Sequence, residues 1–289
     1  MKGFEKMKNI IIIGAGPAGI SAALYTARSG IETMVITHGK SALLKTEKIE
    51  NYYGFYGSGE ELYKKGIESA VKLGVNVIDD EVVSVEYGEK FGVSTTGGKY
   101  YADAVIIAVG NQRNAPLIDG LKEYEGKGVS YCAVCDGFFY RGKNVAVIGS
   151  GAYAKNEADE LIPLAGNVTV LTNGEETGAE FDCQVMTDKI VRIDGDGVVS
   201  SVVFENGDKL DVSGVFVAVG TAGGSDLAKK LGIVTDKDKI SVNSAMETNI
   251  PGVYAAGDCT GGMLQIAKAV HDGAEAAMSV IKYVRSLKG

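Results

Sequence analysis

The chain has 289 residues, of which 45% are hydrophobic, 40 are glycine and only 4 are proline. That is enough apolar material for two ordinary domains, or for one large domain, with many tight turns. The formal net charge of −8 argues against a nucleic-acid surface, because such a surface needs concentrated positive charge.

The first predicted element is a short buried strand at Asn9–Ile13, which is apolar without alternation. The loop Gly14-Ala15-Gly16-Pro17-Ala18-Gly19 follows, then a helical pattern to Gly30 and a strand at Thr33–Thr37. This is a dinucleotide fingerprint in its usual context, where glycines allow a sharp turn and the helix N-terminus faces a pyrophosphate. One usual feature is missing, because Thr37-His38 provides no carboxylate for a ribose hydroxyl.

The uncharged run from Ile10 to Ala27 also has the length of a signal peptide or a membrane span. Glycines and a proline interrupt this run at the positions that a nucleotide loop requires. We therefore interpret it as part of the folded protein, and we predict neither export nor membrane insertion.

The same pattern occurs again downstream. A strand at Asn144–Ile148 leads into Gly149-Ser150-Gly151-Ala152-Tyr153-Ala154, a helix through Leu161 and a strand at Val168–Leu171. The segment Val105–Gly110 also resembles Val215–Gly220 almost residue for residue. Both halves therefore look like copies of one nucleotide-binding architecture.

The C-terminal part has a predicted strand at Gly252–Asp258 and a long helical pattern from about Met263 to Val284. This helix has no counterpart in the second copy, so the simplest layout returns it to the first domain. We predict an α/β fold with two Rossmann-like, three-layer nucleotide-binding domains, the second inserted into the first. The expected domains are 1–114 with 246–289, and 115–245, with boundaries near Asn114 and Ala245.

Cys132 and Cys135 lie about a dozen residues ahead of the second glycine loop. Two cysteines at this spacing can close a small disulfide ring or provide half of a zinc site. The other two cysteines are isolated and the chain has only two histidines, so zinc lacks further good ligands. We favour a redox pair and predict no metal. Four cysteines without a dense disulfide pattern are typical of a reducing cytoplasm.

The string Val-Ser-Tyr-Cys-Ala-Val-Cys-Asp-Gly-Phe-Phe at 129–139 resembles the low-molecular-weight thioredoxin reductases. Glu50–Phe55 and Gly252–Asp258, followed by Gln265-Ile266, resemble the same family. The likeness runs in order through essentially the whole chain. It implies that the first glycine loop and the Gly-Asp strand bind FAD, and that the inserted domain carries the dithiol.

By this resemblance, Cys135 faces the flavin, Cys132 forms the mixed disulfide with the substrate, and Asp136 is the acid/base partner. A thiolate is the nucleophile in disulfide exchange, and a neighbouring carboxylic acid can move its proton. The residue type alone leaves open that Asp136 caps a helix instead. Cys259, directly after Asp258, is interpreted as a buried small residue.

The resemblance also implies a set of FAD-binding positions. Asp258 is expected to bond the ribityl chain, and the backbone near Gln265 is expected to approach the flavin ring. The full set is Gly14, Gly16, Pro17, Ala18, Gly19, Asn51, Gly110, Gly257, Asp258, Gln265 and Ile266.

The chain departs from the family at the expected NADPH site. The family has arginines after the second strand of the inserted domain, and their guanidinium groups hold the 2′-phosphate. Here that position reads Leu-Thr-Asn-Gly-Glu-Glu at 171–176, with no arginine between Arg141 and Arg192. Tyr153 is also expected to fill the pyrophosphate space. We predict that the pyridine nucleotide site is lost, with a drifted loop that still binds a nucleotide weakly as the alternative.

Two further departures lie on the flavin side, where Gly39–Leu44 replaces the family's Gly-Gly-Gln-Leu segment and Leu264 replaces an arginine. The whole combination resembles the ferredoxin-dependent flavin thioredoxin reductases of anaerobic bacteria. We therefore expect a cytoplasmic homodimer that reduces thioredoxin with electrons from reduced ferredoxin. The alternatives are a flavin dithiol oxidase that uses oxygen, an NAD(P)H-dependent thioredoxin reductase with an atypical site, and a flavin-binding redox sensor. Nucleic acid and membrane are not expected partners.

Overall fold

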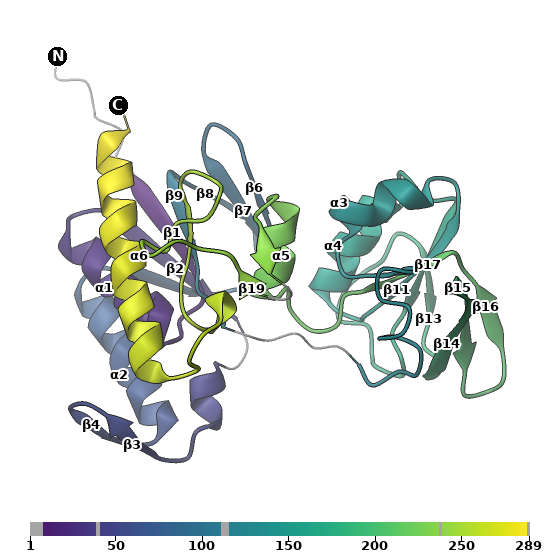
Figure 1. Ribbon diagram of the computed structural model, residues 1–289, viewed down its shortest axis with the longest axis horizontal. Helices are drawn as coiled ribbons and strands as arrows, with labels where there is room; N and C mark the ends of the chain where they lie inside the picture. The colour runs from purple at the N-terminus through teal and green to yellow at the C-terminus, as the bar shows by residue number, and fades with distance from the viewer. Residues whose placement is uncertain (1–7, 39–40, 111–115, 237–238, 288–289) are drawn as a thin grey trace. The chain divides into compact units, whose positions relative to one another are not determined.

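The structure is a computed structural model that describes residues 8–38, 41–110, 116–236 and 239–287. Internal contacts divide the chain into two units, Met1–Gln112 with Gly223–Gly289, and Arg113–Ala222. Both units are α/β, and the second is inserted into the first (Figure 1). The predicted fold class is confirmed. We call the two parts the first unit and the second unit.

The first unit is built on a parallel sheet of five strands in the order β20-β9-β1-β2-β5. Their bounds are β1 Asn9–Ile13, β2 Glu32–Thr37, β5 Asn76–Asp79, β9 Ala104–Ile107 and β20 Val253–Ala255. Because both faces of the sheet are covered, the central strands β1 and β9 are apolar without alternation, and their isoleucines are almost fully buried.

Helices cover one face of this sheet, and a small antiparallel sheet lies on the other (Figure 1). The helices are α1 Pro17–Arg28, α2 Gly59–Lys72 and α6 Ile266–Ser286. The antiparallel sheet consists of β6 Val82–Glu86, β7 Phe91–Thr95 and β8 Lys99–Ala102. Ile10, Ile12 and Ile106 form one core with Ala22 of α1 and Val280 of α6, so the C-terminal helix packs in the first unit.

Short elements complete the first unit. They are η1 Ala42–Lys45, β3 Ile49–Tyr52, β4 Phe55–Gly57, α5 Gly224–Lys230, β18 Thr235–Asp236, β19 Lys239–Ile240 and η3 Asp258–Thr260. The second boundary therefore falls after Ala222, not near Ala245, because α5 and β19 pack with the first unit. A Cβ at Gly224 would lie 2.9 Å from Cys259 and 3.2 Å from Val109. The estimated first boundary near Asn114 lies outside the described residues.

The second unit repeats the layout with the parallel sheet β10-β17-β11-β12-β13. Helical segments lie beside one face, and the antiparallel strands β14 to β16 lie beside the other (Figure 1). Its elements are β10 Val129–Ser130, α3 Ala133–Asp136, η2 Gly137–Tyr140, β11 Asn144–Ile148, α4 Ala152–Leu161, β12 Asn167–Leu171, β13 Gln184–Met186, β14 Ile190–Asp196, β15 Val198–Phe204, β16 Lys209–Asp211 and β17 Gly214–Val217.

The two sheets differ in the origin of one edge strand. In the first unit, β20 beside β9 comes from the C-terminal part of the chain. In the second unit, β10 beside β17 comes before the glycine loop and leads directly into Cys132. The dithiol therefore stands where this edge strand of the second sheet ends.

The last helix begins later than its pattern predicts, at Ile266 and not near Met263. Gly261 and Gly262 have φ of 82° and 76°, and Gln265 is an extended N-cap, so the chain cannot be helical before that point. Among the described helices, none is long and apolar enough to cross a bilayer. The run from Ile10 to Ala27 forms β1, the glycine loop and most of α1.

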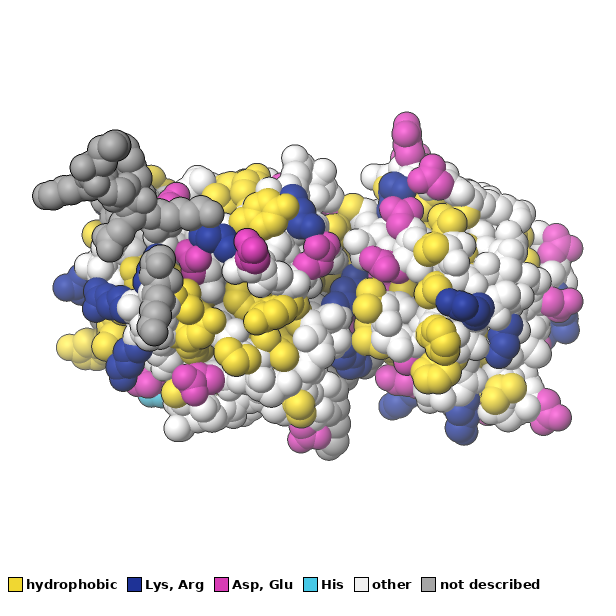
Figure 2. Space-filling view, turned by 90° about the horizontal axis from the view of Figure 1, so that it is seen from above, with side chains coloured by type: hydrophobic (Ala, Val, Ile, Leu, Met, Phe, Trp, Pro, Cys, Tyr) yellow, Lys and Arg dark blue, Asp and Glu magenta, His cyan; other side chains and the backbone are white. Residues whose placement is uncertain are grey.

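The surface has a mixed charge pattern. On the face shown in Figure 2, lysine and arginine side chains are interspersed with aspartate and glutamate over both units. An extended field of positive charge, which nucleic-acid binding favours, is not visible on that face.

Candidate active site

The first glycine loop connects β1 to α1 at the carboxyl edge of the sheet. Gly14 has φ of 104°, and a Cβ there would lie 2.4 Å from the carbonyl oxygen of Ala108. A Cβ at Gly19 would lie 1.9 Å from the carbonyl oxygen of Gly14. These two glycines are therefore required by the fold itself, because no side chain fits at either place.

Gly16 is different, because its nearest neighbour would be Ser41 Oγ at 3.7 Å from an added Cβ and its φ is −68°. The fold does not require glycine at this position, so the space above it is available for a ligand that approaches the backbone. Pro17 begins α1, whose N-cap makes no side-chain hydrogen bond. Backbone N–H groups at such a helix start bind a pyrophosphate well.

The predicted C-terminal residues of the FAD site lie beside this loop. A Cβ at Gly257 would be 2.9 Å from Ala18 Cβ, so the Gly257-Asp258 turn adjoins the start of α1. Gln265 is the N-cap of α6, and its Oε1 accepts a hydrogen bond from Asn51 Nδ2 at 3.1 Å. Ile266 begins the helix, and Gly110 follows β9 with φ of 75°. The structure thus places these residues along one edge of the first unit.

Lys268 is a residue of this region that the sequence analysis missed. Its Nζ lies 2.7 Å from Asp272 Oδ2 and donates to the carbonyl oxygens of Gly257 at 3.0 Å and Gly261 at 2.6 Å. Asp272 is 3% exposed and also accepts from the Gly257 N–H at 3.1 Å. The pair therefore fixes the turn that carries Asp258 onto α6. The i, i+4 spacing of Lys268 and Asp272 is the signal that could have revealed it.

Cys132 and Cys135 form a disulfide with a Cα–Cα distance of 5.3 Å. Cys132 is the N-cap of α3, and its Sγ accepts a hydrogen bond from the Cys135 N–H at 3.2 Å. Cys132 is buried, whereas Cys135 is exposed. With both sulfurs joined to each other, neither is a zinc ligand in this state. We call residues 132–135 the dithiol turn.

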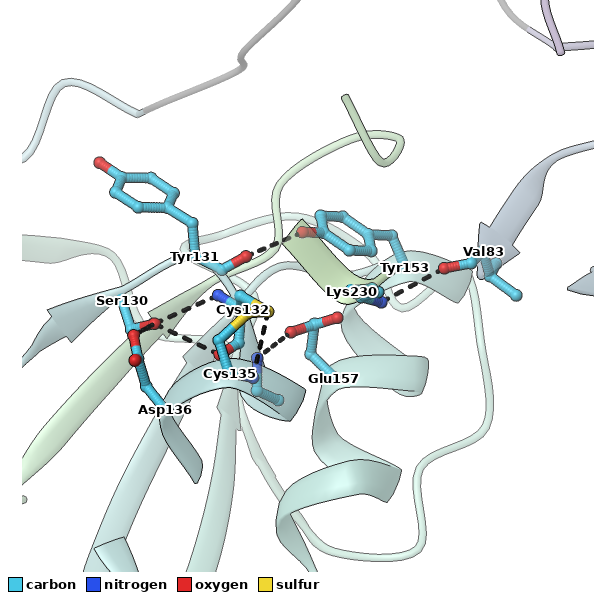
Figure 3. Close-up of a disulfide and its surroundings, with 10 residues drawn as sticks. Val83, Ser130, Tyr131, Cys132, Cys135, Asp136, Tyr153, Glu157 and Lys230 are labelled. Atoms are coloured by element: carbon cyan, nitrogen blue, oxygen red, sulfur yellow. Dashed lines mark hydrogen bonds between the residues drawn. A yellow bond between two sulfur atoms is a disulfide. The ribbon is translucent and has the colours of Figure 1, made fainter. Parts of the chain in front are cut away.

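Asp136 adjoins the dithiol turn through Ser130, as Figure 3 shows. Ser130 Oγ donates to Asp136 Oδ2 at 2.6 Å and accepts from the Cys132 N–H at 3.2 Å. Asp136 is the N-cap residue of η2, but its side chain makes no capping hydrogen bond there. The capping interpretation therefore fails, and the carboxylate is held beside the cysteines. Ser130 is a second residue that the sequence analysis missed.

Helix α4 supports the dithiol turn from its other side (Figure 3). Glu157 is 1% exposed, and its Oε2 accepts a hydrogen bond from the Ala133 N–H at 2.6 Å. Tyr153 is 2% exposed, and its hydroxyl donates to the carbonyl oxygen of Tyr131 at 3.3 Å. The expectation that Tyr153 fills the pyrophosphate space is therefore wrong, because its ring is buried and reaches toward the residue before Cys132.

Exposed apolar side chains follow the dithiol in the chain. Phe138 and Phe139 are 65% and 70% exposed, and Val134 within the dithiol turn is 51% exposed. The Arg141 guanidinium lies over the Phe138 ring at 5.2 Å from its centroid. Exposed aromatic rings next to a reactive disulfide are typical of a surface that docks a protein partner.

Other segments of the chain bond to Ser150 in the second glycine loop, although a Cβ added at Gly151 would meet no atom within 4 Å. Ser150 Oγ donates to Glu175 Oε2 at 2.7 Å, and the Gly178 N–H donates to the Ser150 carbonyl oxygen at 2.8 Å. A Cβ at Gly178 would lie 3.7 Å from Gly151 Cα. A carboxylate and a backbone segment therefore lie at the loop where a nucleotide phosphate would bind.

The two remaining cysteines are free thiols outside these contacts. Cys259 is buried, and burial raises the pKa of its thiol to about 12. Its Sγ lies 3.3 Å from the Ala256 carbonyl oxygen, so it is the buried small residue that the sequence predicts. Cys183 is half-buried, and burial raises its thiol pKa as well. Thiols with raised pKa values are poor nucleophiles, so neither competes with the dithiol.

Comparisons with known proteins agree with this geometry. The family model "Pyridine nucleotide-disulphide oxidoreductase" matches residues 8–273. Thioredoxin reductase from Bacillus subtilis (strain 168) is 36% identical over 98% of this chain and 97% of its own length.

Two solved structures are similar over almost the whole chain. The atypical thioredoxin reductase TRi from Desulfovibrio vulgaris Hildenborough has a TM-score of 0.90 and 40% identity, covering 96% of this chain and 98% of its own. A ferredoxin-flavin thioredoxin reductase from Clostridium acetobutylicum has a TM-score of 0.71 and 34% identity, with the same two coverages of 96% and 98%. With its two Rossmann-like units and its Cys132–Cys135 disulfide, the chain belongs to the pyridine nucleotide-disulphide oxidoreductase family, as a homologue of thioredoxin reductases.

Proposed function

We propose that this protein is an FAD-dependent thioredoxin reductase that receives its electrons from reduced ferredoxin and not from NADPH. The single observation that carries the choice of donor is the second glycine loop, where Glu175 and Gly178 both bond to Ser150. The pyrophosphate of NADPH would meet the Glu175 carboxylate there, and the carboxylate repels it. The segment 171–176, where the family holds the 2′-phosphate, offers no arginine to attract that group.

The residues of the first unit fit FAD. The open backbone at Gly16 and the uncapped start of α1 suit the pyrophosphate, and Asp258 suits the ribityl hydroxyls. Asn51, Gln265 and Ile266 would lie at the flavin ring. When bound, FAD supplies the exchange between single-electron donors and the two electrons that a disulfide takes up.

The dithiol turn carries out the exchange with thioredoxin. Cys132 is buried in the disulfide form, so this step requires its sulfur to become accessible once the pair is reduced. The Cys132 thiolate then attacks the thioredoxin disulfide, and one sulfur of thioredoxin leaves and takes a proton. Cys135 then attacks Cys132 in the mixed disulfide, so that the second thioredoxin sulfur leaves and the Cys132–Cys135 bond forms again. Asp136, held by Ser130, is placed to move the protons of these steps. Phe138 and Phe139 would dock thioredoxin.

Energetics permit ferredoxin as the donor. A potential of about −400 mV for a plant-type ferredoxin and about −270 mV for thioredoxin leaves about 130 mV, or about 6 kcal/mol for two electrons. The similar Clostridium acetobutylicum protein, named a ferredoxin-flavin thioredoxin reductase, supports this donor. The thioredoxin reductases that are similar to about the same degree leave NADPH as the alternative that an experiment must exclude.

A ferredoxin surface needs local positive charge, which the sequence offers at Lys45, Lys48, Lys64 and Lys65. Lys48 and Lys64 each lie 2.6 Å from a glutamate oxygen, so their net attraction for an acidic partner is small. We propose that docking uses Lys45 and Lys65 beside them. We also propose, from the resemblance to the family, that the protein is a homodimer in the cytoplasm.

The test is anaerobic spectroscopy of the flavin. Reduced ferredoxin should bleach its absorbance at the speed of turnover, whereas NADPH and NADH should act at least about 100-fold more slowly. Bleaching by NADPH at catalytic speed would identify an NADPH-dependent enzyme. Rapid oxygen consumption with a small dithiol would identify an oxidase. A purified protein without flavin would remove the proposal altogether.

A further inference from the structure

Glu157 is a buried carboxyl group that has no role in the reaction steps proposed above. It lies in α4, only 1% of it is exposed, and its Oε2 accepts from the Ala133 N–H at 2.6 Å. Ala133 directly follows Cys132, so this oxygen contacts the backbone that separates the two sulfurs (Figure 3).

The hydrogen bond by itself does not require an acid. A glutamine at this position would accept the same bond through its amide oxygen and has nearly the same shape. A carboxyl group is more costly to bury than an amide, because it can carry a charge. An amide would make the same bond, so the ability to ionise is what distinguishes the group at this position from glutamine.

A charge at this place acts differently on the two redox states. The disulfide carries no charge, whereas the reduced pair carries one whenever a thiol ionises. A nearby negative charge disfavours the thiolate, and it does so strongly where water is excluded. The titratable groups beside the turn include Asp136 on the Ser130 side, Tyr140 in η2, Tyr131 directly before Cys132, and Tyr153 and Glu157 in α4. Among their side chains, that of Glu157 accepts a hydrogen bond from the backbone of the turn itself.

We infer that Glu157 keeps the reduction potential of the Cys132–Cys135 pair low by its charge, and so makes the pair a stronger electron donor to thioredoxin. A dithiol whose reduced form is stabilised is a poor reductant, so a carboxylate that destabilises that form has the opposite effect. The inference rests on the proposed function, because it gives Glu157 a role only if this pair is redox-active. Glu157 acts through the cysteines and is not itself a group that reacts.

The test uses exchange with glutathione. Two glutathione thiols give up two electrons and two protons and form a disulfide, while the Cys132–Cys135 bond breaks and two protein thiols form. The full-length protein is equilibrated without oxygen in glutathione buffers of known ratio at neutral pH. Free thiols are then trapped with a maleimide and counted from the intact mass.

Glu157→Gln should shift this equilibrium toward the dithiol by about fivefold, which corresponds to about 20 mV for a two-electron couple. The reduced variant should also react faster with iodoacetamide, because more of its thiol is ionised. Glu157→Asp, which keeps the charge, should stay close to wild type. Glu160→Gln is the matched control, because it removes an exposed carboxylate from the same helix.

An equilibrium for Glu157→Gln within about twofold of wild type would overturn the inference. An equal shift in Glu160→Gln or in Glu157→Asp would also overturn it, since the effect would then not come from a charge at this place. The thiol equilibrium requires neither ferredoxin nor thioredoxin. Its outcome is therefore separate from the spectroscopic test of the electron donor.

Discussion

The two glycine loops occupy the same place in two copies of one sheet, yet they differ in what surrounds them. An added Cβ has room at both Gly16 and Gly151, and neither α1 nor α4 begins with a side-chain cap. At the second loop, Ser150 bonds to Glu175 and to Gly178 of the same chain. The fold therefore preserves the loop even where other segments of the chain bond to it, because strand and helix packing require the turn independently of a ligand.

In the second unit, the helix that follows the glycine loop, α4, has a different role from α1. Tyr153 and Glu157 in α4 both bond to the backbone around Cys132, through Tyr131 and Ala133. In the first unit, by contrast, the corresponding helix α1 packs against α6 through small buried residues. We therefore expect the second unit to serve mainly as the support of the dithiol, and the first unit to bind the cofactor.

The largest effect is expected at the dithiol. Cys135→Ser should lower thioredoxin reduction by at least about 1000-fold, because a hydroxyl does not form the disulfide. Turnover is measured with reduced ferredoxin, and flavin content is measured by absorbance to show that the first unit is intact. Cys183→Ser is the control and should turn over like wild type. Substantial turnover in Cys135→Ser would remove the second unit from the reaction.

Matched substitutions in the two loops sharpen the comparison most directly. Gly16→Glu should weaken FAD binding by at least about 100-fold, since the side chain fills the ligand space with negative charge. Gly151→Glu should leave FAD binding and ferredoxin-driven turnover within about twofold of wild type. Neither glycine has a positive φ or a close neighbour, so both variants should fold. Equal loss of turnover in both variants would contradict the division of labour.

A smaller gain is expected if charge is reversed at the second loop. Glu175→Arg combined with Glu176→Arg should tighten binding of 2′,5′-ADP by about tenfold, because repulsion becomes attraction. Binding should remain weak, since Gly178 still lies against the loop. Calorimetry with 2′,5′-ADP and with 5′-AMP separates the phosphate contribution. Tight binding of 2′,5′-ADP to the unaltered protein would mean that the site was never lost.

The smallest effect concerns the support beneath the dithiol. Tyr153→Phe removes the hydroxyl that bonds to Tyr131 and should lower the free energy of unfolding by about 1 kcal/mol. Denaturant titration measures this change, while FAD absorbance should stay constant because the first unit is unaffected. A loss of FAD without a loss of stability would show that Tyr153 acts elsewhere.

Much of the site could be predicted from local patterns. The apolar strand Asn9–Ile13, the loop after it and the pair Cys132 and Cys135 each signal their role within a few residues. Ser130 and Glu157 could not be identified in this way, because each acts through a partner that the fold brings near, namely Asp136 and Ala133. Lys268 differs from them, since its partner Asp272 is four residues away in the same helix and the spacing is a local signal. The prediction for Tyr153 is wrong for a similar reason, since its position at the start of α4, next to the glycine loop, does not reveal that its ring is buried.

The sequence by itself determined the α/β class, the duplication and the candidate dithiol, because strand periodicity, glycine spacing and cysteine spacing are local properties of the chain. Only the tertiary structure decided that Glu175 and Gly178 bond to Ser150 of the second loop. It also decided that the chain after Ala222 packs in the first unit. Those outcomes depend on contacts between distant segments. Such contacts are set by the packing of whole layers and leave no periodic trace in the residues that make them.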